Sequence, residues 1–125
     1  MTTSPYADLL GLRFDTDAQG HPFVTMDYAH NLLGRPGFLH GGAIGGMLEM
    51  AAWAALRAAL DEEMTVIKPI NVTIDFMRGG RERTTFAAGA VTRLGARIAN
   101  VTATAWQDDR DRPIAGARLN YLLKR

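Results

Sequence analysis

The sequence contains no cysteine, very little lysine and no excess of charge of either sign. Without cysteine there is no disulfide framework, no thiolate metal site and no cysteine nucleophile. Only two of the 14 basic residues are lysine, and 13 acidic residues balance them to a formal net charge of +1. This balance argues against the strongly basic surface that binds nucleic acid.

Long uninterrupted hydrophobic runs are missing as well. The most apolar stretch, residues 41–60, carries Glu49 and Arg57, and a carboxylate in the middle of a membrane is costly. The first residues lack the basic and apolar regions of a secretion signal. A chain of 125 residues has room for one domain, which we expect to span residues 1–125 and to be cytoplasmic.

Alternating patterns predict a mainly antiparallel β protein. Apolar and polar residues alternate strictly from Ile70 to Phe76, which is typical of a half-buried strand. Gly79-Gly80 and Gly95 mark turns, and short connections favour antiparallel neighbours. The expected strands are 9–15, 23–28, 70–76, 84–94, 97–106 and 114–123, with a loop at 29–39.

One convincing helix is predicted from Gly42 to about Leu60, where proline is absent and alanine, leucine and methionine dominate. Its apolar residues cover nearly the whole circumference, which indicates a helix that other elements wrap. We therefore predict an α+β fold in which a long curved antiparallel sheet wraps around one central apolar helix.

The helix begins with the segment His40-Gly41-Gly42. The first N–H groups of a helix have no intrahelical partner, and glycine lets a ligand approach the backbone closely. Because the N-terminus of a helix also favours negative charge, the segment is a candidate oxyanion or anion site with His40 beside it. The alternative is that His40 only caps the helix and the glycines only pack against a strand.

Glu49 is the only acid between Asp27 and Asp61, within a run of alanine, leucine, methionine and glycine. A carboxylate in so apolar a helix either has a partner or serves a function. The structural alternative is an ion pair with an arginine of the sheet.

The spacing of the two candidates indicates a dimer. Nine helical residues separate His40 from Glu49, which corresponds to opposite faces and about 13 Å along the axis. We expect Gly41 and Glu49 to be on opposite faces in the same way. One chain then cannot bring both to the same atom, so a second subunit has to supply one of them.

The motif resembles that of hotdog-fold acyl-CoA thioesterases, in particular the phenylacetate-pathway (PaaI-like) group. In that pattern His-Gly-Gly is followed by an acid nine positions after the histidine, as in His40-Gly41-Gly42 and Glu49 here. The flanks agree over about residues 9–123, namely at Leu10-Gly11-Leu12, Asp75-Phe76-Met77-Arg78 and Arg93-Leu94-Gly95-Ala96-Arg97.

The resemblance implies a role for each residue of the motif. The Gly41 amide would bind the thioester carbonyl oxygen, His40 would orient or polarise the thioester, and Glu49 of the partner subunit would be the general base or the nucleophile. CoA would lie along the subunit interface. The substrate-binding residues expected on this basis are Gly42, Asn31, Trp53, Asn71, Phe76, Arg78, Arg93, Gly95 and Arg97.

Arginine is abundant in this part of the chain. Five arginines between positions 78 and 97 are accompanied by only one acid, Glu82, and such a cluster suits the phosphates of CoA. The alternative is a solvated strand edge that resists aggregation.

Two departures from the family pattern bear on the substrate. Relatives often carry an amide six residues before the histidine, where this chain has Gly34, and the nearest amide is Asn31. Some relatives place a hydroxyl four residues after the acid, where this chain has Trp53, which would narrow the acyl pocket.

The sequence favours an acyl-CoA thioesterase acting on an aryl or medium-chain thioester. The alternatives are a non-catalytic acyl-CoA binding or sensing protein, and a hotdog dehydratase or hydratase, against which the lack of a His-Phe-Pro motif argues. We expect no metal and no cofactor beyond the CoA of the substrate, and no nucleic-acid or membrane partner. The smallest active unit is expected to be a homodimer, assembled into a homotetramer.

Overall fold

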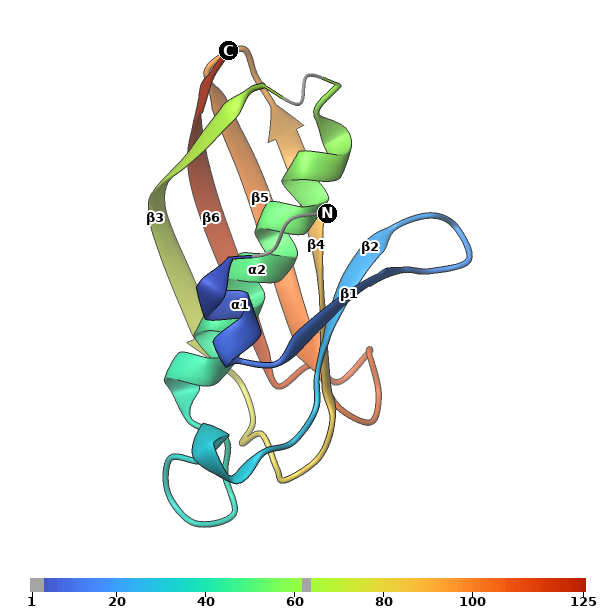
Figure 1. Ribbon diagram of the computed structural model, residues 1–125, viewed down its shortest axis with the longest axis vertical. Coiled ribbons are helices and arrows are strands. Elements are labelled where there is room, and N and C mark those ends of the chain that lie inside the picture. Colours follow the sequence, from blue (N-terminus) through green and yellow to red (C-terminus); the bar gives the residue numbers. More distant parts are fainter. Residues whose placement is uncertain (1–3, 62–63) are drawn as a thin grey trace.

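The computed structural model describes residues 4–61 and 64–125, which form one six-stranded antiparallel sheet and one long helix (Figure 1). The elements in chain order are α1 (Pro5–Leu9), β1 (Leu12–Thr16), β2 (Pro22–Met26), the 3-10 turn η1 (His30–Leu32), α2 (Gly41–Ala59), β3 (Val66–Phe76), β4 (Thr85–Leu94), β5 (Ile98–Trp106) and β6 (Ala115–Lys124). The α+β class predicted from the sequence is confirmed.

The helix α2 packs along one face of the curved sheet and forms the core with it (Figure 1). Met47, Leu48 and Leu56 are completely buried, and small residues of the sheet let the helix come close. A Cβ added at Gly89 of β4 would lie only 2.8 Å from the carbonyl oxygen of Ala51. Burial of this apolar helix is the main stabilising contribution that positions its N-terminus.

The strand order is β1-β2-β4-β5-β6-β3, so β3 is an edge strand and pairs with β6. The prediction that Gly79-Gly80 turns β3 into a neighbouring β4 is wrong. Instead, this connection passes the start of α2, where the Leu39 N–H donates to the Gly80 carbonyl at 2.9 Å. The side chains of Ile44 in α2, of Leu39 just before α2 and of Ile114 just before β6 fill the space around Gly80, which is buried for that reason.

The N-terminal segment also differs from the prediction. The structure has a helical turn, α1, in which the Ser4 hydroxyl accepts a hydrogen bond from the Ala7 N–H and Pro5 occupies the first turn. The expected strand therefore begins at Leu12 instead of Leu9, after Gly11 at a φ of 67°. Ser4 followed by Pro5 is a helix-start signal. The prediction of a strand over residues 9–15 did not take this signal into account.

Strand β3 exposes much of its apolar surface. Val66, Ile70 and Phe76 are 50%, 53% and 55% exposed, although they lie in an eleven-residue strand at the edge of the sheet. A long apolar edge is a template for pairing with another strand. Among the described residues, no helix is long and apolar enough to cross a membrane.

Candidate active site

His40 is the N-cap of α2, and its Nδ1 accepts a hydrogen bond of 2.8 Å from the Gly42 N–H. The interpretation that His40 caps the helix is therefore correct, but the cap uses only one of its two ring nitrogens. Because Nδ1 is the acceptor, the neutral ring carries its proton on Nε2. That N–H is available to donate to a ligand oxygen, whereas the Gly42 N–H is occupied by the cap.

Gly41 occupies the first helical position, where the backbone N–H has no intrahelical acceptor. The hydrogen bonds of residues 4–61 and 64–125 include no acceptor for it either. A Cβ at Gly41 would lie 3.3 Å from Cζ of Phe76, so the aromatic ring of β3 lies directly against this glycine. The structure thus brings together Phe76 and the free N–H at the start of the helix.

A cavity of about 360 Å³ opens in front of Gly41. Phe76 and Arg78, which the sequence grouped with the substrate-binding residues, line it together with Gly41. Phe38 and Arg35 line it as well, with the guanidinium of Arg35 3.9 Å from the centre of the Phe38 ring. The cavity therefore combines an apolar wall, a positive charge and the N-terminus of a helix.

A second cavity, of about 300 Å³, is lined by His40, which is not among the residues that line the first. Asn31 of η1 lines it, so the amide nearest to the histidine in the sequence does come close to it in the fold. Tyr6 and Leu9 of α1 form another part of its wall. Sequence analysis missed Tyr6 because it did not predict α1, although the Ser4-Pro5 signal was present.

Glu49 is half-buried on α2 and makes no ion pair with any described residue. The sequence left open an ion pair between Glu49 and an arginine of the sheet, and no described arginine forms one. Arg57, the cation of the same helix, donates to the Thr65 carbonyl at 2.8 Å. The carboxylate is close enough to Tyr121 of β6 to affect it: burial raises the pKa of Tyr121 to about 12, and the charge of Glu49 adds to the rise.

The prediction that Gly41 and Glu49 lie on opposite faces of the helix is wrong. His40 is outside the helix, and from Gly41 to Glu49 there are eight residues, which turn about 80° and rise about 12 Å. Gly41 lies against Phe76, and Gly45, halfway between, would bring a Cβ to 3.0 Å from Cδ1 of Ile74. The line of residues Gly41, Gly45 and Glu49 along α2, called the stripe below, therefore faces the edge strand β3. The rise of about 12 Å between Gly41 and Glu49 still prevents these two groups of one chain from acting on the same atom.

Two other residues expected in the site, Asn71 and Trp53, do not line the cavities beside Gly41 and His40 of the same chain. Asn71 points to the opposite face of β3 from Ile74 and Phe76, where its Oδ1 accepts a hydrogen bond of 2.8 Å from Asn120. Trp53 follows Glu49 by one turn and is half-buried.

The turn with Arg93, Gly95 and Arg97 lies at the other end of the sheet from Gly41. Strand β6 pairs Ala115 with Phe76 at one end and Leu122 with Ile98 at the other. The seven residue steps along β6 from Ala115 to Leu122 correspond to about 23 Å, which separates this turn from the end of the sheet that carries Phe76. Within residues 4–61 and 64–125, moreover, no three His, Asp or Glu side chains are placed to hold a metal ion.

Comparison with known families identifies one match: the model of the thioesterase superfamily matches residues 36–114, which include both His40-Gly41-Gly42 and Glu49. No curated protein matches the chain.

Solved structures of similar fold are numerous. A protein of Chromobacterium violaceum shares 37% identity over 96% of this chain and 83% of its own, with a TM-score of 0.80. A Ralstonia eutropha protein, described as a thioesterase related to phenylacetic acid degradation, is 21% identical over 97% and 92% of the two chains, with a TM-score of 0.84. A Bacillus halodurans protein solved with CoA is 15% identical over 98% and 80%, with a TM-score of 0.89.

Proposed function

Because this chain belongs to the thioesterase superfamily and is a thioester hydrolase, we propose that it cleaves acyl-CoA thioesters to the free acid and CoA. The observation that carries this proposal is the half-buried carboxylate of Glu49, which has no ion pair among the described residues and lies on the same side of α2 as Gly41. The fold shared with a protein solved with CoA supports CoA as the thiol part of the substrate.

The start of α2 would bind the thioester carbonyl. The N–H of Gly41 would donate to the carbonyl oxygen, and the Nε2–H of the preceding residue, His40, would be a second donor to the thioester. Donors that are fixed before the reaction stabilise the negative charge that develops on this oxygen, and the helix dipole acts in the same direction.

Glu49 of the partner subunit would activate water. It takes a proton from the water, whose oxygen adds to the carbonyl carbon; the carbon–sulfur bond then breaks, and CoA leaves as the thiolate and is protonated. Direct attack by the carboxylate, with an anhydride that water then hydrolyses, gives the same products.

A two-fold homodimer provides this arrangement. The exposed apolar edge of β3 is the surface that such a dimer would bury, and it borders the stripe that carries Gly41 and Glu49. An antiparallel partner helix would place its Glu49 near the Gly41 of the first chain, and symmetry would create two sites. A homotetramer of two such dimers and a cytoplasmic location stay predictions.

The acyl group is proposed to be an aryl or medium-chain acid. Phe76 beside Gly41 and the half-buried Trp53 one turn beyond Glu49 provide flat apolar walls. The likeness of fold to a phenylacetic acid degradation-related protein, and the PaaI-like pattern of the sequence, support an aryl substrate. Asn31 in the cavity beside His40 would supply a polar contact.

Thiol release from a panel of acyl-CoAs tests the proposal. Because the chain has no cysteine, a thiol reagent detects only the CoA released. We expect hydrolysis of aryl-CoAs or medium-chain acyl-CoAs that Glu49→Gln abolishes. Tight binding of acyl-CoAs without thiol release would instead identify a binding or sensing protein.

A further inference from the structure

A third cavity, of about 430 Å³, lies on the face of the sheet that points away from α2. Ala87 of β4 is completely buried in the core beneath the helix. Its neighbours Phe86 and Ala88 therefore project from the opposite face, where both line this cavity. We call it the outer cavity. It shares no lining residue with the cavities beside Gly41 and His40, so it is separate from the candidate active site.

The outer cavity has aromatic walls and a shallow floor. Phe23 of β2, Phe86 of β4 and Trp106 of β5 supply the walls. The rings of Phe86 and Trp106 are stacked, with their centres 6.0 Å apart and their planes at 25°. Beyond Phe86, β4 contributes only the methyl groups of Ala88 and Ala90 on this face. Ligand sites are concave and rich in aromatic side chains, and a space of this shape takes a flat ring.

One acid, Asp17, lines the outer cavity, and the β1–β2 turn already binds its carboxylate. Its Oδ1 accepts hydrogen bonds of 2.9 Å from the N–H groups of Gln19 and His21, and its Oδ2 lies 3.8 Å from Nδ1 of His21. The hydrogen bond from the His21 N–H is the main reason why the pKa of Asp17 lies below its ordinary value. The carboxylate is therefore ionised and held by groups of its own turn.

Arg110 is the cation of the outer cavity that lacks a carboxylate partner. It comes from the turn that joins β5 to β6, and its guanidinium lies 4.6 Å from the centre of the Trp106 ring. Its charge is near enough to lower the pKa of Asp17 further, but no carboxylate of the described residues forms an ion pair with Arg110. A guanidinium that lies over an aromatic ring keeps its N–H donors at the edge of that ring, where a carboxylate can accept from them.

We propose that the outer cavity binds an aromatic carboxylate, with the ring against the aromatic walls and the carboxylate paired with Arg110. The inference does not rest on the proposed function, because its residues are not those of the site around Gly41 and Glu49. An acid of this class is also what the proposed reaction releases, so the outer cavity would let the product bind away from the place where it forms.

The charges of the outer cavity favour a small anion over a second copy of the chain. A copy stacked on this face would take Arg110 and the pair of Asp17 and His21 out of water, and the removal of charges from water is costly. An aromatic carboxylate instead brings the opposite charge to Arg110 and leaves the polar rim in contact with solvent.

Tryptophan fluorescence reports directly on the outer cavity, because Trp53 and Trp106 are the only two tryptophans of the chain. In Trp53→Phe, all of the tryptophan emission comes from Trp106. Phenylacetate is the probe, excitation is set where only tryptophan absorbs, and we expect a saturable change in the emission. Phenylacetamide keeps the ring but loses the charge. It should bind about tenfold more weakly or less tightly still, since a hydrogen bond to a charged group contributes about that factor.

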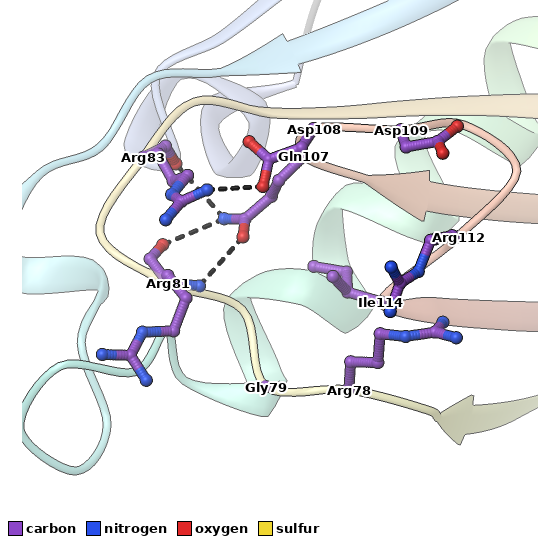
Figure 2. Close-up of a pocket in the computed structure, with 9 residues that line it drawn as sticks. All are labelled: Arg78, Gly79, Arg81, Arg83, Gln107, Asp108, Asp109, Arg112 and Ile114. Atoms are coloured by element: carbon purple, nitrogen blue, oxygen red, sulfur yellow. Dashed lines mark hydrogen bonds and ion pairs between the residues drawn. The ribbon is translucent and has the colours of Figure 1, made fainter.

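Two variants of this single-tryptophan protein test the two parts of the site. Arg110→Ala should weaken phenylacetate binding about tenfold or more and affect phenylacetamide much less. Ala88→Leu, which fills the floor from the outer face, should abolish the binding of both. The matched control is Arg112→Ala, which should leave the Kd for phenylacetate unchanged. Arg112 belongs to the same turn but lines a different cavity, of about 340 Å³, which adjoins the Gly41 cavity through the shared residue Arg78 (Figure 2).

Thermal unfolding checks that all three variants fold. The proposal is overturned if Trp106 emission shows no saturable change, if phenylacetate and phenylacetamide bind equally, if binding persists in Ala88→Leu, or if Arg112→Ala weakens binding as much as Arg110→Ala. Sedimentation at the same protein concentrations tests the other occupant. If Trp106 emission changes as the chain associates and phenylacetate leaves it unaltered, a second copy covers this face and the proposal fails. None of these readouts involves acyl-CoA hydrolysis, so failure of the outer cavity and failure of the proposed function are distinguishable.

Discussion

The two ends of helix α2 differ in how their polar groups are satisfied. At the far end, Arg57 donates to the Thr65 carbonyl, and Arg125 donates to the carbonyls of Gly95 and Ala96 in the turn nearby. At the start, the Gly41 N–H has no acceptor among the described residues, and cavities open beside it. At the far end, called the closed end below, groups of the chain itself form these hydrogen bonds. At the start, called the open end, donors remain for a ligand.

The arginines show the same contrast. In the sequence, Arg78 and Arg97 belong to one basic stretch and look equivalent. The fold places them at opposite ends of the sheet, where Arg78 lines two adjoining cavities and Arg97 is exposed beside the turn that Arg125 braces. Within one chain, a cluster in the sequence is therefore not a cluster in space unless the strand register makes it one.

The largest expected effect is that of Glu49→Gln. Loss of a general base typically lowers turnover by about 10²–10⁴-fold. The variant should fold as the wild type does, because the carboxylate has no ion pair within the described part of the chain. Rates of thiol release and thermal unfolding check both statements. A variant that keeps more than half of the wild-type kcat would remove Glu49 from the mechanism.

Gly41→Pro tests the free donor at the open end. Proline lacks the N–H but suits the first helical position, and His40, at φ −65° and ψ 136°, has the conformation that a following proline requires. Loss of an oxyanion donor should lower kcat by about 10²–10³-fold.

The matched control is Gly41→Ala, which keeps the N–H and adds a methyl group 3.3 Å from the exposed Phe76 ring. It should retain most of the activity. If alanine is as damaging as proline, the space at Gly41 matters and the N–H does not.

At the closed end, Arg57→Ala should change stability and leave chemistry alone. The variant loses the hydrogen bond to the Thr65 carbonyl, for which we expect about 1 to 3 kcal/mol in the free energy of unfolding. Urea unfolding measures this loss, and kcat should stay within twofold of the wild type. A large fall in kcat without loss of stability would break the contrast between the two ends.

The smallest expected effect concerns Tyr121. Burial first, and the charge of Glu49 second, raise its pKa to about 12, above the ordinary value of 10.0. A raised pKa means that the folded state holds the proton more tightly, so this contribution to stability is complete below pH 10 and is lost as the pH rises toward 12. Tyr121→Phe should flatten the pH dependence of unfolding in that range. In Glu49→Gln, the phenol should titrate at a slightly lower pH.

Local patterns in the sequence predict much of this fold. The alternation in residues 70–76 and the alanine-rich run of α2 identify their elements correctly, and the class of fold follows from them. The partner of β3 is not predictable in the same way, because pairing with β6 joins residues about 50 positions apart and depends on how the connection passes α2.

The residues of the candidate site also divide into those that local sequence shows and those that only the fold brings together. His40, Gly41 and Glu49 stand out through local composition, whereas Tyr6 reaches its cavity only through tertiary packing. The error about opposite faces had a simple origin: a helical count that began at His40, one residue before the helix does.

The most direct test of a shared site combines the two inactive variants. Glu49→Gln and Gly41→Pro are unfolded together and refolded, so that mixed dimers form. Each mixed dimer has one site with both defects and one with an intact Gly41 facing an intact Glu49. With random mixing, activity should return to about a quarter of the wild type. A mixture as inactive as its parents, although mass spectrometry confirms folded mixed dimers, would contradict a site built from Gly41 of one chain and Glu49 of the other.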